Sequence, residues 1–298
     1  MKNKLSEGST TLNAYHQERS KEACLEVNEM MKHPFTLKQA KAQTEWLKEG
    51  MRRSGRPAKT MKISNYKRLI QVIPYMEQAF EVKRSQWTNL VSEDILNQIF
   101  GENVEPNRVS MTDPKNPSTK LIDQTVVISR FELFHKYQNL ELFIVKVLMW
   151  GYPTKGRGKN IKNLLKESNL TLLKNAFKKF ETEESITISD IGELLKLKIE
   201  GLGLSTLTKF LYFLRLRIGT YRALILDLRV ISALNSGKYR DPGIEQFKPL
   251  KYENALLHFS DYLIFINELA KDLQAKPDQV EMFLFEYGRN LKGMVPMN

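Results

Sequence analysis

The sequence predicts a mainly α-helical protein with at most a small β element. Good helix formers recur with apolar residues at three- and four-residue spacing through most of the chain. Only the run at 125–128, TVVI, is rich enough in β-branched residues to indicate a strand. Of 298 residues, 42% are hydrophobic and 10% aromatic, which is enough apolar material for one large or two modest folded units.

The expected helices follow this apolar spacing from one end of the chain to the other. They are 22–31, 37–51, 66–80, 140–150, 161–166, 171–180, 191–198, 205–217, 223–235, 252–274 and 277–287. Between 103 and 125 the content of Pro, Asn, Asp and Ser rises, which is typical of a loop or a boundary. We therefore expect a helical N-terminal extension with a basic loop at 1–102, a loop or linker at 103–128 and a second domain at 129–298.

The charge balance indicates a polyanionic partner. The chain has 46 Lys and Arg against 34 Asp and Glu, a formal net charge of +12, and a field of this sign concentrates nucleic acid on the surface. A solvated lysine-rich face is the alternative. One cysteine, Cys24, and four histidines leave no internal disulfide and no usual zinc ligand set, so we expect no metal and no cofactor. We find no apolar leader or membrane-spanning run and expect a cytoplasmic protein.

The first concentration of positive charge lies at 47–68. Glu49 is its single acidic residue, and the stretch RRSGRPA at 52–58 breaks the helical pattern. The basic residues are Lys48, Arg52, Arg53, Arg56, Lys59, Lys62, Lys67 and Arg68. Such a loop could lie along phosphates, and a flexible solvated linker is the alternative.

The most informative stretch is 189–234, which predicts two helices joined by a two-glycine turn. We expect Ser189 or Asp190 to cap the first helix, which ends near Ile199. Gly201 and Gly203 permit a tight turn and a close approach of another chain.

The second helix of this stretch begins directly after the turn. The first N–H groups of a helix have no helical partner, and the helix dipole makes them suitable for a phosphate. We therefore expect Gly201, Gly203, Leu204 and Ser205 to contact a DNA phosphate.

Asp227 follows Gly203 by 24 residues (227 − 203) and precedes another expected helical run. The turn, this spacing and the basic chain together resemble the helix-hairpin-helix DNA glycosylase superfamily, which includes endonuclease III, MutY and 8-oxoguanine glycosylase. Its pattern is Leu-x-Gly-x-Gly, a helix, a short loop and an aspartate that opens the next helix, and IEGLG at 199–203 matches the first part.

Other segments are most similar to bacterial proteins with an 8-oxoguanine DNA glycosylase (OGG) fold. They are TKFLYF at 208–213, ALILD at 223–227, LMWGY at 148–152 and the C-terminal 262–285. The resemblance covers roughly 130–290. It implies a two-lobed helical glycosylase fold, with the N-terminal helical extension outside the resemblance, and duplex DNA as the partner; no obligate protein partner is evident.

The resemblance implies that Asp227 is the catalytic carboxylate. A glycosylase breaks the bond between C1′ and the base nitrogen through a transition state with positive charge on the sugar, which a carboxylate stabilises while it orients or deprotonates water. The apolar neighbours Leu226 and Leu228 would strengthen that interaction. The alternative is that Asp227 only caps the next helix, and the two roles are compatible.

Family members that also cleave the DNA strand carry a nucleophilic lysine two positions after the second glycine, where this chain has Ser205. Lys209 lies four residues further and shares a helical face with Ser205, so it is a candidate catalytic residue. A lysine amine attacks only when it is deprotonated. The alternatives are a phosphate contact or a solvated charge, and hydrolysis without strand cleavage is the simpler expectation.

A second basic segment, 151–162, follows Trp150 and contains Lys155, Arg157 and Lys159 but no acidic residue. Glycines between cations suit a loop along a phosphate backbone, and Trp150 or Tyr152 could stack on an extruded base. A polar connector beside a core tryptophan is the alternative.

The leading hypothesis is a DNA glycosylase that flips out a damaged or modified base and hydrolyses its N-glycosidic bond. An 8-oxoguanine substrate follows only from the resemblance, and a phage-modified base, with a role in antiphage defence, is a further candidate. A non-catalytic DNA-binding protein is the competing class, and an RNA-binding or assembly protein is a third option.

Overall fold

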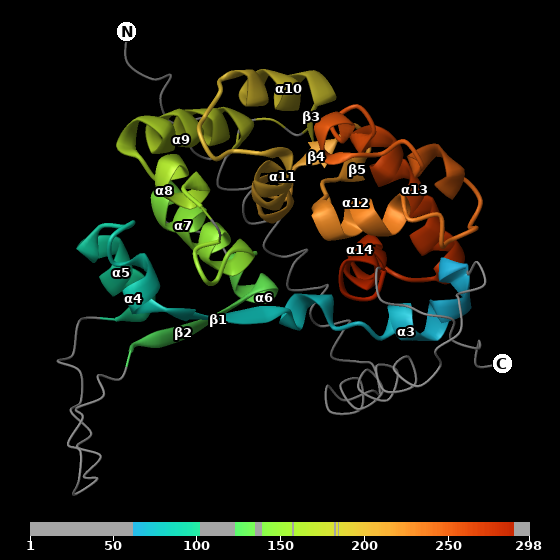
Figure 1. Cartoon of the computed structure of the whole chain (residues 1–298), viewed down its shortest axis with the longest axis horizontal. Coiled ribbons are helices and arrows are strands. Elements are labelled where there is room, and N and C mark those ends of the chain that lie inside the picture. Colours follow the sequence, from blue (N-terminus) through green and yellow to red (C-terminus); the bar gives the residue numbers. More distant parts are fainter. Residues whose placement is uncertain are drawn as a thin grey trace, which may run out of the picture. The chain divides into compact units, whose positions relative to one another are not determined.

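The structure is a computed structural model, and it describes residues 62–101, 123–134, 139–156, 158–181, 183 and 185–288 (Figure 1). The helices expected at 22–31 and 37–51 lie outside the described residues, as does most of the basic stretch at 47–68. The described chain is mainly helical with a few short strands, which confirms the predicted fold class.

The described residues divide into two compact units. The first contains the described residues up to Met76, then Lys179–Leu197, and then the chain from Gly203 onwards. The second contains Glu77–Lys178 and Lys198–Leu202. These units do not follow the boundaries expected near 102 and 128, because a strand from the expected extension pairs with the strand at 125–129.

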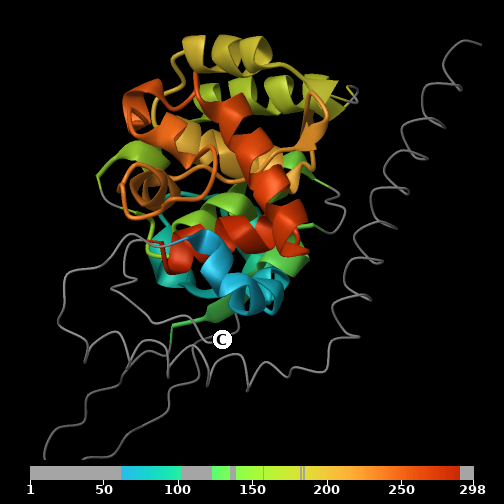
Figure 2. The same cartoon turned by 90° about the vertical axis from the view of Figure 1, so that its right-hand side faces the viewer.

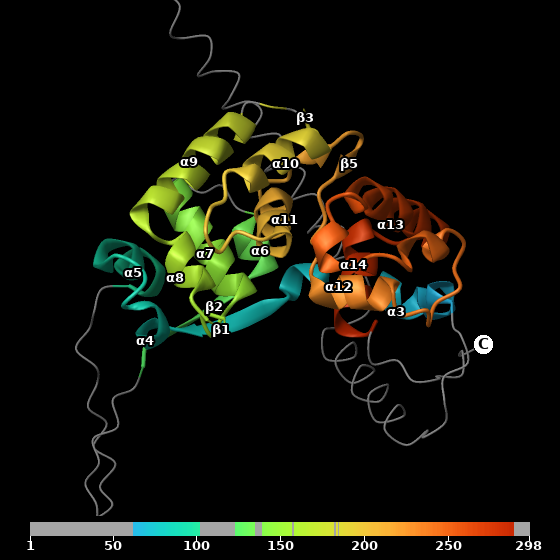
Figure 3. The ribbon, with the colours of Figure 1, turned by 45° about the horizontal axis from the view of Figure 1, so that its top comes forward.

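The second unit is built on two antiparallel strands, β1 (Ala79–Lys83) and β2 (Thr125–Ser129). Figure 3 shows α7, which contacts both strands. This helix is apolar on nearly all sides and almost entirely buried, so it forms the core of the unit. The helices of this unit are α4 (Arg84–Trp87), α5 (Glu93–Phe100), α6 (Arg130–Leu133), α7 (Leu140–Gly151), α8 (Asn160–Leu164) and most of α9 (Glu167–Glu181).

The first unit is organised around α14, which packs against α3, α12 and α13 (Figure 2). Apolar side chains that recur at helical spacing on α13 and α14 fill the core between these helices. Its α-helices are α3 (Lys67–Gln71), α10 (Ile188–Lys196), α11 (Leu204–Phe213), α12 (Leu228–Leu234), α13 (Phe259–Leu273) and α14 (Pro277–Glu286).

Short strands and 3₁₀ turns complete this unit. Three strands form a small sheet in the order β3-β4-β5, in which β3 (Ser185–Ile186) is parallel to β4 (Arg217–Ile218) and β4 is antiparallel to β5 (Tyr221–Arg222). The 3₁₀ turns are η1 (Ile63–Tyr66), η2 (Tyr75–Glu77, at the boundary between the units), η3 (Ile244–Phe247) and η4 (Tyr252–Asn254).

The prediction of a helix at 66–80 is wrong for the second half of this range. The α-helix ends at Gln71, and β1 occupies 79–83. Pro74 has no backbone N–H and disfavours helical backbone in the residue before it, which explains the break. β1 then pairs with β2, a partner that is distant in sequence.

Two further expected helices are shorter than predicted. The helix expected at 205–217 ends at Phe213, because Arg215 has a left-handed backbone with a φ of 57° and Arg217 begins β4. The run at 252–274 begins as a 3₁₀ turn, and its α-helix starts only at Phe259.

Candidate active site

The hairpin predicted from the sequence consists of α10, the turn at 197–203 and α11. Thr187 caps α10: its hydroxyl accepts from the Asp190 N–H, and the Asp190 carboxylate accepts from the Thr187 N–H at 2.8 Å. The Asp190 carboxylate also accepts from the Thr187 hydroxyl at 2.7 Å, and its two bonds from Thr187, the backbone one first, hold the pKa of Asp190 below its usual value. The expected caps Ser189 and Asp190 lie inside the helix instead, and Asp190 supplies the other half of the capping box.

Gly201 lies where the hairpin turn meets the second basic segment. Its φ is 88°, which L side chains rarely adopt, and a Cβ at this position would overlap the carbonyl oxygen of Asn160. Asn160 is the first residue of α8 and belongs to the basic segment at 151–162. The Lys166 ammonium also lies 2.9 Å from the Glu200 carboxylate. The structure therefore brings together the turn and the basic segment, which the sequence predicted separately.

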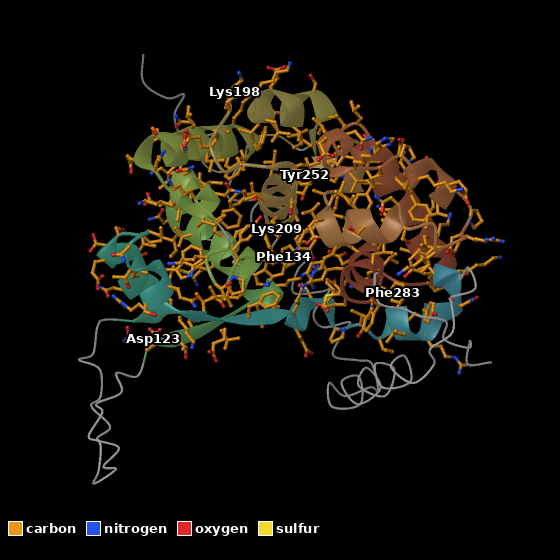
Figure 4. The ribbon with its side chains drawn as sticks, viewed as in Figure 1. Asp123, Phe134, Lys198, Lys209, Tyr252 and Phe283 are labelled. Carbon is orange, nitrogen blue, oxygen red and sulfur yellow. The ribbon has the colours of Figure 1, made fainter. Side chains whose placement is uncertain are left out.

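Several lysines of the basic segment and of the turn are exposed. Lys155 and Lys159 belong to the basic segment, and Lys198 lies in the turn with a φ of 51° (Figure 4). Lys198 was not singled out by the sequence analysis, because it precedes the glycines and belongs to no basic run. Arg157, the remaining predicted cation, lies outside the described residues.

The first turn of α11 begins at Gly203, the N-cap residue. A Cβ here would overlap the Tyr252 hydroxyl, so glycine allows η4 to approach. The Thr206 and Leu207 N–H groups donate to the Gly203 carbonyl, whereas within the described chain those of Leu204 and Ser205 have no acceptor. Two amides at the positive end of the helix dipole are thus without an acceptor among the described residues, a position where helices can bind anions.

Lys209 lies on α11 and is only 6% exposed (Figure 4). Its Nζ donates to the Ser205 hydroxyl at 3.0 Å and to the Ser205 carbonyl at 3.1 Å. The ammonium therefore reaches back one turn, to the position where strand-cleaving relatives carry their lysine. This geometry disfavours the alternative of a solvated charge.

Asp227 is the N-cap of α12 and is half-buried. Its Oδ1 accepts from the Arg229 N–H at 2.8 Å and from the Val230 N–H at 3.1 Å. In the described ranges, its Oδ2 accepts no hydrogen bond. The predicted capping role is therefore present, and one carboxylate oxygen is left to interact with a ligand or with water.

The expected helix at 223–235 begins only at Leu228, and the peptide between Ile225 and Leu226 is held by other contacts. The Leu226 N–H donates to the Thr208 hydroxyl at 3.2 Å, and the Ile225 carbonyl accepts from the Tyr262 hydroxyl at 2.9 Å. Sequence analysis did not identify Thr208 or Tyr262, because threonine in a helix and tyrosine in an apolar stripe carry no local signal of a distant partner.

Trp150 lies in the core of the second unit and is 4% exposed. Its Nε1 donates to the Gln78 carbonyl at 3.2 Å, the Arg130 guanidinium lies 5.3 Å from the ring centroid, and the Phe80 ring packs edge-on at 5.7 Å. These contacts match the alternative of a core tryptophan. Tyr152, the other candidate for stacking on a base, is half-exposed and lies beside Gly156.

None of the helices among the described residues combines the length and the hydropathy that a membrane span requires. No group of three or more His, Cys, Asp or Glu side chains within the same residues is placed to hold a metal ion.

The helical fold, the two-glycine turn and the aspartate at the start of α12 are the features on which the sequence resemblance rests. Residues 74–285 match the family described as "Putative 8-oxoguanine DNA glycosylase OGG-like protein". The match covers more than half of the chain, and the protein belongs to this family, which indicates a glycosylase-type function on DNA. Comparison with curated proteins and with solved structures finds no match.

The matched region begins earlier than the sequence resemblance at roughly 130–290. It includes β1 and the helices that follow it, which the sequence analysis assigned to an N-terminal extension. The pairing of β1 with β2 explains why these residues belong with the rest of the family domain.

Proposed function

We propose that the protein is a DNA glycosylase that hydrolyses the N-glycosidic bond of a flipped-out base and uses Asp227 as its catalytic carboxylate. One observation carries the proposal. One carboxylate oxygen of Asp227 caps α12, and the other accepts no hydrogen bond within the described residues. The segment that ends at Asp227 is hydrogen-bonded to α11, and two amides in the first turn of α11 have no acceptor within the same residues. A phosphate on that turn would place a nucleotide near the carboxylate.

The open oxygen of Asp227 supports the following chemistry. As the bond between C1′ and the base nitrogen breaks, the base leaves with the bonding electrons and the sugar gains positive charge, which the carboxylate stabilises. Water then forms the new bond to C1′, its proton passes to the carboxylate, and an abasic site remains. The base must leave the duplex stack before this reaction can occur.

The proposed substrate is a damaged or modified base in duplex DNA. The family description supports an 8-oxoguanine-like base as the first one to test. A phage-modified base is the second, and it would give the enzyme a role in antiphage defence.

The direct test is to incubate the full chain with genomic and phage DNAs and to identify the released bases by mass spectrometry. We expect one modified base to be released, with an equal number of abasic sites in the DNA. A protein that binds these DNAs but releases no base from any of them would be a DNA-binding protein without glycosylase activity.

We propose that the exposed lysines beside the hairpin turn contact DNA phosphates. Each such contact contributes about one unit to the slope of log affinity against log salt concentration. We therefore expect Lys159→Gln and Lys198→Gln each to weaken duplex binding and to reduce this slope by about one unit. Lys178→Gln is the matched control, because Lys178 is an exposed lysine on α9 of the same unit. Equal effects of all three variants would indicate a response to net charge only.

Lys209 is proposed as a second site residue, because its ammonium lies at the first turn of α11. Lys209→Met keeps an unbranched apolar side chain and removes only the ammonium group, and we expect it to slow base release by roughly tenfold or more. Borohydride treatment during the reaction separates two roles. A wild-type protein–DNA adduct that is absent from the variant would identify a nucleophile, and a slower variant without any adduct would identify an electrostatic role. An unchanged rate in Lys209→Met would contradict both.

A further inference from the structure

One peptide group close to Asp227 is held at both ends by side-chain hydroxyls. The N–H of Leu226 donates to the Thr208 hydroxyl of α11 at 3.2 Å, and the C=O of Ile225 accepts from the Tyr262 hydroxyl of α13 at 2.9 Å. The C=O of Ile225 and the N–H of Leu226 belong to the same peptide unit. Both bonds are buried. Together they determine the plane and the direction of the main chain one residue before the carboxylate.

This peptide lies in a buried segment with no regular secondary structure. Residues 223–226 belong to no helix or strand, and each is at most 2% exposed. Buried backbone groups need hydrogen-bond partners, which a helix or a sheet would normally supply. The segment begins at the Ala223 N–H, which donates to the Leu216 carbonyl at 2.8 Å, and it ends at the Asp227 cap. Between these two points, the two hydroxyls support the peptide that leads into Asp227.

Thr208 also connects this peptide with the first turn of α11. Its hydroxyl donates to the Ser205 carbonyl at 3.2 Å while it accepts from Leu226, so its one proton and one of its lone pairs are both used. The Ser205 carbonyl also accepts from the Lys209 ammonium at 3.1 Å. One hydroxyl thus joins the turn that carries the open amides to the main chain that carries Asp227.

From this geometry, and resting on the proposed function of Asp227, we infer that Thr208 and Tyr262 are positioning residues for base excision. They hold the Asp227 carboxylate at a fixed distance from the phosphate-binding first turn of α11. Their loss should impair the chemical step, because a carboxylate displaced by about 1 Å stabilises the charged sugar much less well. The affinity for DNA should change little, because neither hydroxyl contributes to the open amides.

Thr208→Val and Thr208→Ser test the role of the first hydroxyl. Valine keeps the shape of the side chain and removes the hydrogen bonds, whereas serine keeps the hydroxyl. We expect Thr208→Val to lower the single-turnover rate of base release by about tenfold or more, with the Kd for DNA within about twofold of the wild type. Thr208→Ser should restore most of the rate. All rates are measured well below the unfolding temperature of each variant.

A matched pair of tyrosine variants separates positioning from stability. Tyr262→Phe removes the bond to Ile225, and Tyr239→Phe removes another buried bond of the same type, from the Tyr239 hydroxyl to the Gly288 carbonyl at 3.1 Å. We expect both variants to be less stable and only Tyr262→Phe to excise slowly. Equal slowing in the two variants would overturn the inference.

A double-mutant cycle with Asp227→Asn shows whether the hydroxyls act through the carboxylate. If they do, Thr208→Val lowers the residual rate of Asp227→Asn no further. Multiplicative losses in the double variant would overturn the inference. The inference would also be overturned if the wild type is active and Thr208→Val releases bases at the wild-type rate. That result leaves the glycosylase proposal intact. A wild type that releases no base from any DNA overturns the glycosylase proposal, and the inference with it.

Discussion

Asp227→Asn is expected to lose base excision almost completely while it keeps its fold and its affinity for DNA. Asparagine caps helices about as well as aspartate, so its side-chain oxygen can still accept from the Arg229 and Val230 N–H groups. The variant removes the negative charge that would stabilise the sugar cation. We expect the single-turnover rate of base release to fall by about 10²- to 10³-fold.

Two controls accompany the Asp227 variant. Asp190→Asn changes another carboxylate in the N-terminal turn of a helix in the same unit, and we expect an unchanged excision rate. Asp227→Ala removes the cap as well as the charge, so it should unfold more easily by about 1 kcal/mol, measured by chemical denaturation. An Asp227→Asn protein that releases bases at the wild-type rate would show that this carboxylate is only a cap.

Gly201→Ala is expected to disrupt the hairpin turn and to weaken DNA binding. Two effects add at this position: alanine is strained at a φ of 88°, and its Cβ would overlap the Asn160 carbonyl oxygen, which is backbone. The turn and the start of α8 must therefore separate. We expect a loss of roughly 2–3 kcal/mol in the free energy of unfolding, together with a clear fall in duplex affinity measured at a fixed salt concentration.

Gly158→Ala is the matched control, because it isolates the close approach from the backbone strain. Gly158 lies in the same unit with a φ of 75°, and no heavy atom lies within 4 Å of a Cβ built there. We expect it to lose about 1 kcal/mol in the free energy of unfolding and to keep most of its affinity for DNA. Similar losses in the two variants would show that the contact between the turn and Asn160 is unimportant.

The hydrogen bonds around α11 support one proposed view of how the family site is built in this chain. Ser205 occupies the position at which the resemblance places the lysine of strand-cleaving members, and the ammonium of Lys209 hydrogen-bonds to that serine. Thr208 bonds to the same residue and to the segment before Asp227. A change at any of these positions is therefore expected to affect the others, and effects of double variants on excision should not be additive.

The sequence by itself determined the class of fold, the position of the hairpin helices and the candidate aspartate. Apolar spacing predicted α7, α10 and α14 with small errors at their ends, because these helices bury one or more faces regardless of which element packs against them. The run at 125–128 was identified as a strand from its β-branched residues. Gly201 and Gly203 were recognised because few other residues permit such a turn.

Only the tertiary structure decided where α12 starts, why 79–83 is a strand and what surrounds each candidate residue. The start of α12 at Leu228, and not at 223, became clear only once Thr208 and Tyr262, 18 and 37 residues from their partners, were seen to hold the preceding peptide out of the helix. Likewise, the sequence allowed Trp150 to be a base-stacking residue or a core residue, and its contacts in the core decide between the two. Such contacts join residues far apart in the chain, and local propensity and periodicity carry no information about them.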